Sequence, residues 1–374
     1  MDKDTGKAVK DANGEKITSS VEFVAEDTDG SVDVKFNFDG TNLGGKILVA
    51  FEKLYYGEKL YGTHADLEDE EQTMYVPEVE TVALNKETET HHALADGTVE
   101  LLDTVKYRNL LPGRNYTLHG MIVEKETGNP VSEERTLEFV PEKSEGSVEL
   151  RFEISADELC GKTIVVYEEI KADGKSIAEH KDPEAKEQSI YFPEIGTKAL
   201  DENSKTQEGE AKEKQKIIDQ ITYKNLLPDE TYVLKGVLMD KETGKELVDE
   251  NGKRVTAGIS FVPENEEGTI EMTFELDARR LAGKSVVVFE RLYDEEEHLI
   301  AKEEDIENAD QTVLYRKQEI PKNTIVEKPG HNSKEVRKSP KTGDENRMDL
   351  WLVMLCAFGI AVVTEIVIYK RRNR

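Results

Sequence analysis

The chain has 374 residues, a formal net charge of -29 at pH 7 and two cysteines. This length fits about two or three domains. Such an acidic chain repels phosphate backbones, so nucleic acid is excluded as an expected partner. Cys160 lies near the middle of the chain and Cys356 in an apolar run near its end, so no disulfide within one domain is expected.

The N-terminal segment has no apolar core of the kind found in a signal peptide. Instead, Met1–Lys7 matches Met239–Lys245 further along the chain. The match predicts that the sequence begins inside a repeated unit, whose opening strands and any distal domain lie upstream.

Three copies of one unit follow each other. Val49–Glu52 recurs as Val165–Glu168 and as Val287–Glu290. The first two copies are offset by 168 − 52 = 116 positions, and the third by 290 − 168 = 122. The added length falls near Val248–Gly252, which is interpreted as an extended turn. Length that varies only in a turn is typical of a folded repeat.

Each copy has the pattern of β-strands. Ser147–Ile154 alternates polar and apolar residues, as a strand buried on one face does, while Lys162–Glu168 is more continuously apolar and suits a central strand. No helical periodicity persists. We predict an all-β protein of tandem immunoglobulin-like sandwiches, each with about seven strands.

Strand parity places four polar residues among inward-facing apolar ones. Glu168 shares a face with Val166, as Asp103, Gln188 and Thr81 share faces with apolar neighbours of their own. An unpaired buried carboxylate costs several kcal/mol, so these acids are expected to be partnered or neutral. Two explanations remain open at this point: a hydrogen-bonded buried cluster, or strand ends that reach solvent.

These motifs together resemble a known family. The Val-x-Phe/Tyr-Glu strand, the Asp-x-Val-x-Tyr strand with its Asn-Leu-x-Pro turn, and a His-x-Asp followed by Gln are similar to the VaFE repeat, or Thr-Gln ester-bond domain, of Gram-positive adhesins. The resemblance extends from residue 1 to about residue 316. It implies a self-formed ester between a Thr on the first strand and a Gln on the last.

The resemblance assigns roles by position. In the middle copy it implies Thr81 as nucleophile, Gln188 as electrophile, His180 as proton carrier, and Asp103 with Glu168 as a buried acid pair. The third copy has Thr197, Asp219, Glu290 and Gln311, but Glu303 stands at the His position, so a slow or absent bond is expected there. The first copy keeps Glu52, His64 and Gln72 without a Thr or Asp. No cofactor or metal is implied.

The C-terminal end predicts export and anchoring. Leu350–Tyr369 is long and apolar enough for a transmembrane helix, and Lys370–Arg374 is a basic flank of the kind that stays in the cytoplasm. Ser339-Pro340-Lys341-Thr342-Gly343 stands just upstream. This order resembles a sortase sorting signal and implies cleavage between Thr342 and Gly343 with attachment to peptidoglycan. Glu365 inside the span suits a temporary membrane stop better than a permanent one.

Five segments are therefore expected. They are a truncated first repeat (1–78), a complete middle repeat (79–195), a third repeat without the His (196–316), a wall-spanning linker (317–338) and the sorting signal (339–374). The predicted function is a structural stalk of an adhesin on the Gram-positive cell surface, with sortase and peptidoglycan as partners, the membrane as a partner before cleavage, and a host ligand reached through an upstream domain.

Other interpretations remain open. The repeats could bind a host protein or glycan directly, since a fold does not fix function. The chain could be an ordinary single-pass membrane protein. An enzyme with turnover is disfavoured, because His91-His92 has no third ligand at metal spacing and is expected on a surface turn. The acidic run Glu68–Glu71 is expected to be a solvated loop rather than a calcium site, and a Lys-Asn isopeptide would need Asn at the positions of the three Gln residues.

Overall fold

The computed structural model describes residues 1–317. Within them the protein is built from β-strands and two short 3-10 turns. No helix in this part of the chain is both long and apolar enough to cross a bilayer. The linker beyond Lys317, the pentapeptide at Thr342 and Gly343, and the expected transmembrane helix lie outside the described residues.

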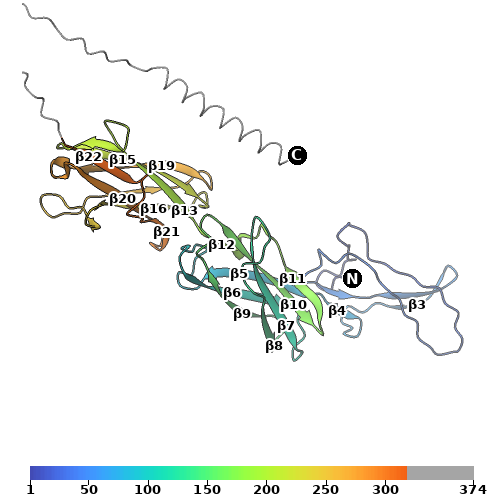
Figure 1. The fold of residues 1–374 in the computed structure, drawn as a ribbon. Helices are drawn as coiled ribbons and strands as arrows, with labels where there is room; N and C mark the ends of the chain where they lie inside the picture. The colour runs from blue at the N-terminus through green and yellow to red at the C-terminus, as the bar shows by residue number, and fades with distance from the viewer. Residues whose placement is uncertain (318–374) are drawn as a thin grey trace, which may run out of the picture. The chain divides into compact units, whose positions relative to one another are not determined.

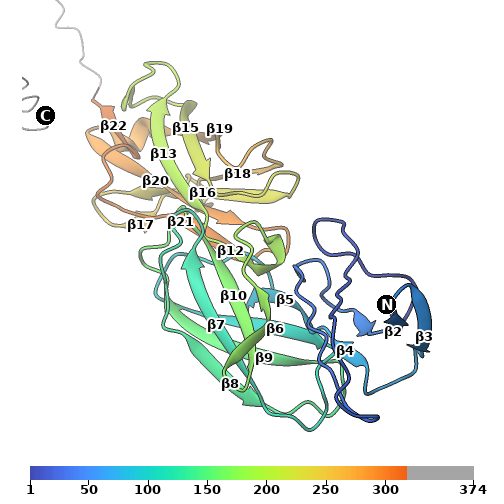
Figure 2. The same cartoon turned by 90° about the vertical axis from the view of Figure 1, so that its right-hand side faces the viewer.

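The middle repeat is a two-sheet sandwich (Figures 1 and 2). The first sheet has the order β5-β6-β9, and the second has the order β11-β10-β7-β8 with β12 also paired to β10. The strands are β5 (Glu78–Asn85), β6 (Thr98–Arg108), β7 (Tyr116–Glu124), β8 (Arg135–Phe139), β9 (Gly146–Ser155), β10 (Thr163–Ala172), β11 (Lys175–His180) and β12 (Ser189–Tyr191). The predicted central strand is β10, which pairs with β7, β11 and β12.

The third repeat has the same two-sheet plan. One sheet has the order β13-β15-β19, and the other the order β14-β22-β20-β16-β17, with β18 on β16 and β21 on β20. The strands are β13 (Glu194–Asp201), β14 (Glu208–Glu210), β15 (Gln215–Lys224), β16 (Tyr232–Asp240), β17 (Lys245–Glu246), β18 (Thr256–Phe261), β19 (Gly268–Leu276), β20 (Lys284–Tyr293), β21 (Leu299–Glu303) and β22 (Thr312–Arg316). The predicted extended turn lies between β17 and β18, closed by an isolated bridge from Val248 to Arg254.

Each of these repeats has its own apolar core between the sheets. In the middle repeat Leu118 and Ile122 of β7 pack against Leu150 and Phe152 of β9. The alternating pattern of β9 is confirmed, because its inward residues are buried and its outward residues exposed. The all-β, sandwich-forming fold class predicted from the sequence is therefore confirmed.

The first 76 residues form much less structure. They contain β1 (Ile47–Val49) paired with β4 (Thr73–Tyr75), and β2 (Glu52–Tyr56) paired with β3 (Lys59–His64). Their buried core consists of Val9, Leu43 and Leu48. Apolar side chains such as Val24 and Tyr56 are 90% and 80% exposed, so these residues form one hairpin and one further strand pair without a closed sandwich.

Gly120 of β7 lies where the two sheets of the middle repeat pack tightly. A Cβ atom at Gly120 would lie 2.5 Å from Leu150 Cδ1 and 2.9 Å from Phe152 Cζ. Both neighbours are buried and cannot turn toward solvent. Only glycine therefore lets β7 pack this tightly on β9.

We expect Gly120→Ala to lower the free energy of unfolding by about 1–3 kcal/mol, because the added methyl group overpacks the core. Urea denaturation measures the change. Glu138→Ala, at an exposed position of β8, is the control and should change stability by no more than about 0.5 kcal/mol. Equal effects of the two substitutions would contradict the tight packing of Gly120.

Candidate functional site

Five polar side chains from five different elements meet in the middle repeat. Thr81 comes from β5, Asp103 from β6, Glu168 from β10, His180 from the end of β11 and Gln188 from η1 (Lys186–Gln188). Asp103, Glu168 and Gln188 have no exposed surface, and Thr81 is 5% exposed. The inward orientation predicted from strand parity is confirmed, and the alternative of strand ends reaching solvent does not hold for these residues.

Sheet pairing explains why the five side chains converge. Glu168 lies opposite His180 on the β10–β11 ladder, and Asp103 lies opposite Ala83 on the β5–β6 ladder. Both β11 and η1 pack against β5, across the space between the sheets. The first strand of the repeat thus faces the segment just before its last strand.

The Thr81 hydroxyl contacts a base. Its Oγ1 atom is 2.6 Å from Nδ1 of His180, and the same ring nitrogen is 3.8 Å from Oε2 of Glu168. If Nδ1 carries no proton, it accepts the hydroxyl hydrogen and makes the oxygen more nucleophilic. This is a hydroxyl–imidazole pair of the kind that precedes acyl transfer.

The two carboxyl groups beside this pair hold a proton in the core. Burial raises the pKa of Glu168, and the charge of Asp103 raises it further, to about 11. Burial also raises the pKa of Asp103, to about 6, although the neighbouring side chains of Glu168 and Gln188 oppose the rise. If both groups were ionised, none of the carboxylate oxygens of Asp103 and Glu168 would have a hydrogen-bond donor. A single shared proton supplies one, so the pair is half-protonated at neutral pH.

The Gln188 amide lies next to the acid pair. Its proximity lowers the pKa of Asp103, and neither polar atom of the amide has a hydrogen-bond partner. It does not lie on the last strand, as the sequence led us to expect, but ends the 3-10 turn before β12. The turn is fixed by Ser189, whose hydroxyl donates to the carbonyl of Ala185 at 2.8 Å. Gln188 is fully buried in this turn, as are its neighbours Ser189 and Ile190.

The third repeat reproduces the acids and the amide. Asp219, Glu290 and Gln311 have no exposed surface. Burial raises the pKa of Glu290, and the charge of Asp219 raises it further, to about 11. The Gln311 amide donates to Thr197 Oγ1 at 2.6 Å and to Glu290 Oε2 at 2.5 Å.

The base is what differs in the third repeat. Glu303 lies opposite Glu290 on β21, as His180 lies opposite Glu168 on β11, so the predicted alignment of these two positions is confirmed. Glu303 accepts a hydrogen bond from the Asn308 amide at 3.3 Å. His298 does not take over, because it lies in the turn after β20, paired with Asp294 at 3.1 Å.

The first repeat holds part of the same set. Glu52 lies opposite His64 on the β2–β3 ladder, 3.8 Å apart, and His64 also contacts Asp69 at 2.9 Å. Gln72 directly precedes β4 and is half-buried. The counterparts of Thr81 and Asp103 are absent from residues 1–76, so these three side chains do not form a closed cluster.

The expectation that His92 lies on a surface turn was also wrong. His92 is not on a surface turn but is 4% exposed, and its Nε2 atom is 3.1 Å from the hydroxyl of Tyr232 in the third repeat. Burial lowers the pKa of His92 to about 4. No signal local to residues 91–92 could reveal this, because the covering residue comes from 140 positions away.

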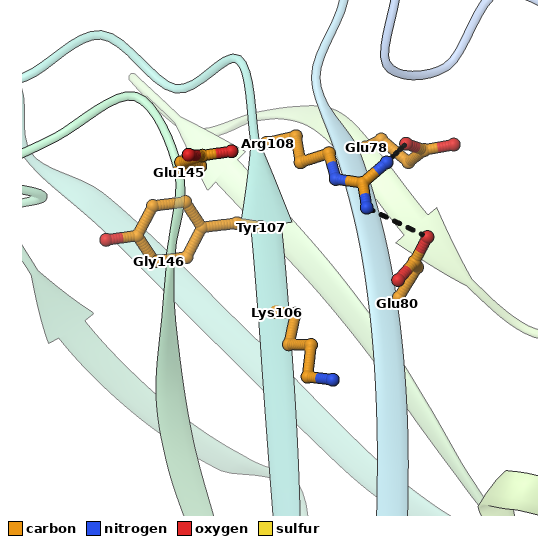
Figure 3. Close-up of a pocket in the computed structure, with 7 residues that line it drawn as sticks. All are labelled: Glu78, Glu80, Lys106, Tyr107, Arg108, Glu145 and Gly146. Carbon is orange, nitrogen blue, oxygen red and sulfur yellow. Dashed lines mark ion pairs between the residues drawn. The ribbon is translucent and has the colours of Figure 1, made fainter.

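Other polar groupings in the described part of the chain lie apart from the buried cluster. A hollow of about 260 Å³ lies beside β5 and β6. Arg108 in its lining forms ion pairs with Glu78 at 3.6 Å and Glu80 at 3.7 Å (Figure 3). Asp294, Glu296 and His298 are close enough together to ligate a cation; of the three, Asp294 is buried, His298 half-buried and Glu296 exposed. Neither grouping includes a member of the buried cluster.

Comparison with known proteins identifies the family. The sequence matches the T-Q ester bond containing domain three times, over residues 1–76, 77–192 and 193–315. The chain belongs to this family. The match covers the whole of the described β-structure except its last residues, and it confirms the resemblance drawn from the repeated motifs.

Solved structures give weaker similarities. A bacterial adhesin from Mobiluncus mulieris containing disulfide, isopeptide and ester bond cross-links is 16% identical, with 57% of this chain and 80% of that chain covered at a TM-score of 0.30. The C-terminal domain of the AgI/II polypeptide BspA from Streptococcus agalactiae is 9% identical, with 60% and 97% covered at a TM-score of 0.31. No match was found among curated protein sequences.

The T-Q domain cluster has a pH dependence that we can predict. Folded Glu168 keeps its proton up to a pKa of about 11, whereas the ordinary value is 4.5. Between these values the folded state binds the extra proton, so its stability falls as pH rises, by at most about 1.4 kcal/mol per pH unit. Thr81→Ala chains, which cannot form a linkage at this hydroxyl, should therefore unfold more readily at pH 8 than at pH 5.

Replacing Glu168 tests whether this residue causes the pH dependence of stability. Thr81→Ala/Glu168→Gln should show a shallower pH dependence over the same range, because the amide cannot ionise, and Thr81→Ala/Glu138→Gln is the exposed control. Scanning calorimetry of each chain between pH 5 and pH 8 measures the slopes. Equal slopes for all three variants would show that Glu168 does not hold a proton in the folded core.

Proposed function

We propose that the chain is part of a surface-protein stalk whose middle repeat is closed by an ester between Thr81 and Gln188. The observation that carries the proposal is the contact of 2.6 Å between Thr81 Oγ1 and His180 Nδ1, beside a buried acid pair in a T-Q ester bond domain. The chemistry is a single event in each molecule, without turnover.

The reaction balances without a cofactor. The Thr81 oxygen attacks the side-chain carbonyl carbon of Gln188 as His180 accepts the hydroxyl proton. The carbon–nitrogen bond of the amide then breaks, and the proton moves through His180 to the departing nitrogen. The products are an ester and one ammonia.

The acid pair activates the amide. A carboxyl group that stays protonated in an apolar core can donate a hydrogen bond to a carbonyl oxygen and stabilise the negative charge that develops on it. Asp103 and Glu168 hold such a proton next to Gln188. Burial thus turns one of two ordinary acids into a hydrogen-bond donor that can activate the Gln188 carbonyl.

The ester would act mechanically. It links the first strand of the repeat to the segment before its last strand, closing a loop of 188 − 81 = 107 positions. A disulfide closing a loop of this size stabilises by about 4–5 kcal/mol in chain-entropy terms. Tension entering at β5 and leaving at β12 would also pass through the covalent bond rather than through the hydrogen bonds of the core.

Attachment to the cell surface is the other part of the proposal. The Ser339–Gly343 pentapeptide, the apolar segment and the basic end support cleavage by a sortase at Thr342 and transfer to peptidoglycan, with the membrane holding the precursor. A cell-surface location is also in keeping with membership of the T-Q ester bond domain family. A host ligand would be bound by a domain outside this sequence.

Mass spectrometry of the full chain tests the ester. We expect the folded chain to be one ammonia lighter than its sequence, with a peptide that links Thr81 to Gln188. Thr81→Ala should restore the full mass because it removes the attacking oxygen. Thr98→Ala, at an exposed position on β6, should keep the loss. Recovery of unmodified Thr81 and Gln188 from the folded chain would contradict the proposal.

The third repeat offers a test by gain of function. Thr197, Asp219, Glu290 and Gln311 are in place, and only the base is missing. Glu303→His should therefore supply it and add a second ammonia loss, with a new peptide linking Thr197 to Gln311. Glu303→Gln removes the same charge without adding a base, so it should leave a single loss. A second loss in the unaltered chain would show that the histidine is dispensable.

A further inference from the structure

One asparagine recurs in the same unusual conformation at the start of the middle and third repeats' Asn-Leu-x-Pro turns. Asn109 follows β6 and Asn225 follows β15, and they are 225 − 109 = 116 positions apart. Their φ angles are 59° and 60°, in the left-handed region. Asparagine is among the few residues with a side chain that adopt this region readily.

Each asparagine reaches into the preceding repeat. Asn225 Nδ2 donates to the carbonyl oxygens of Lys162 at 2.6 Å and Phe192 at 3.3 Å. Asn109 Nδ2 donates to the corresponding oxygens of Lys46 at 3.3 Å and Val76 at 3.1 Å. The acceptors are themselves offset by 162 − 46 = 116 and 192 − 76 = 116 positions, so the same contact forms at both junctions.

The two acceptors form the closing end of the preceding repeat. Phe192 N donates to Lys162 O at 3.0 Å, and Gly161 N donates to Phe192 O at 2.9 Å. A carbonyl oxygen has two lone pairs, so each of these oxygens can accept a hydrogen bond from the asparagine in addition to its backbone hydrogen bond. One side chain thus bridges both strands at the place where the Gln-bearing segment ends.

The second junction carries further contacts. Thr163 Oγ1 donates a hydrogen bond to Asn225 Oδ1 at 2.7 Å. Both the oxygen and the nitrogen of the Asn225 amide are therefore hydrogen-bonded to the preceding repeat. The residue at the position of Thr163 in the first repeat is Ile47, which has no hydroxyl. The buried His92–Tyr232 contact lies at the same junction. Only Pro193 separates Phe192 from β13, so little free chain connects the two repeats.

We propose that this asparagine is a clamp by which each repeat binds the closing carbonyl pair of the repeat before it, so that successive repeats are held in one orientation. Its partner is a preceding copy of the same module that presents two backbone carbonyls at that edge. The proposal does not depend on ester formation, because none of the residues that form the clamp takes part in the cross-link.

Distance measurements across the second junction test the clamp. Spin labels would be placed at Thr136→Cys on β8 and Ser260→Cys on β18, both exposed, in the full chain in detergent with Cys160→Ser and Cys356→Ser. Relative motion is the default for linked domains, so loss of the clamp should widen the distance distribution about twofold or more. The parent chain should give a narrow one.

Two variants and one matched control decide the result. Asn225→Asp keeps the size and backbone preference but turns a carboxylate toward two carbonyl oxygens, and Asn225→Gly keeps the left-handed backbone without a side chain. Both should widen the distribution. Asn109→Asp, at the other junction, should not. If Asn225→Asp fails to fold, Asn225→Gly decides alone. A narrow distribution in the Asn225 variants, or a broad one in the parent, would overturn the proposal.

Discussion

The protonated acid pair in the core is the constraint on which the rest of the site depends. Asp103 and Glu168 are fully buried, where two carboxylates side by side would strongly destabilise the fold. The same burial raises the pKa of both acids and lets a single proton satisfy the pair. The sandwich therefore tolerates two acids in its core by keeping one neutral. A proton donor beside the Gln188 amide is a direct consequence.

Comparison of the middle and third repeats shows which residues of this site are shared and which differ. The acid pair and the glutamine are the same in the middle and third repeats, with the same pairing of strands around them. The hydroxyl environment differs, because Thr81 contacts an imidazole while Thr197 contacts the amide nitrogen of Gln311. Buried acids and amide can thus be accommodated without a base. The residue opposite the inward glutamate is the variable on which the proposed chemistry depends.

The inferred asparagine clamp and the proposed ester act on the same short stretch of chain. Gln188 directly precedes the last strand of the middle repeat, and the carbonyl of Phe192, four positions later, accepts a hydrogen bond from Asn225. A cross-link stiffens the inside of a repeat, whereas a clamp stiffens the connection between repeats. Together the ester and the clamp would leave few residues between β5 and β13 that could extend under tension.

The sequence by itself determined the repeated unit, the all-β class and the inward orientation of the strand residues Thr81, Asp103 and Glu168. The repeated unit follows from motifs that recur at similar offsets, and the inward orientation follows from the two-residue period of a strand; both can be read from the order of the residues alone. The tertiary structure alone decided that Gln188 ends a 3-10 turn, that His92 is buried by Tyr232, and that Asn225 binds Phe192. Each of these depends on atoms brought from another turn, sheet or repeat, and no local periodicity encodes such contacts.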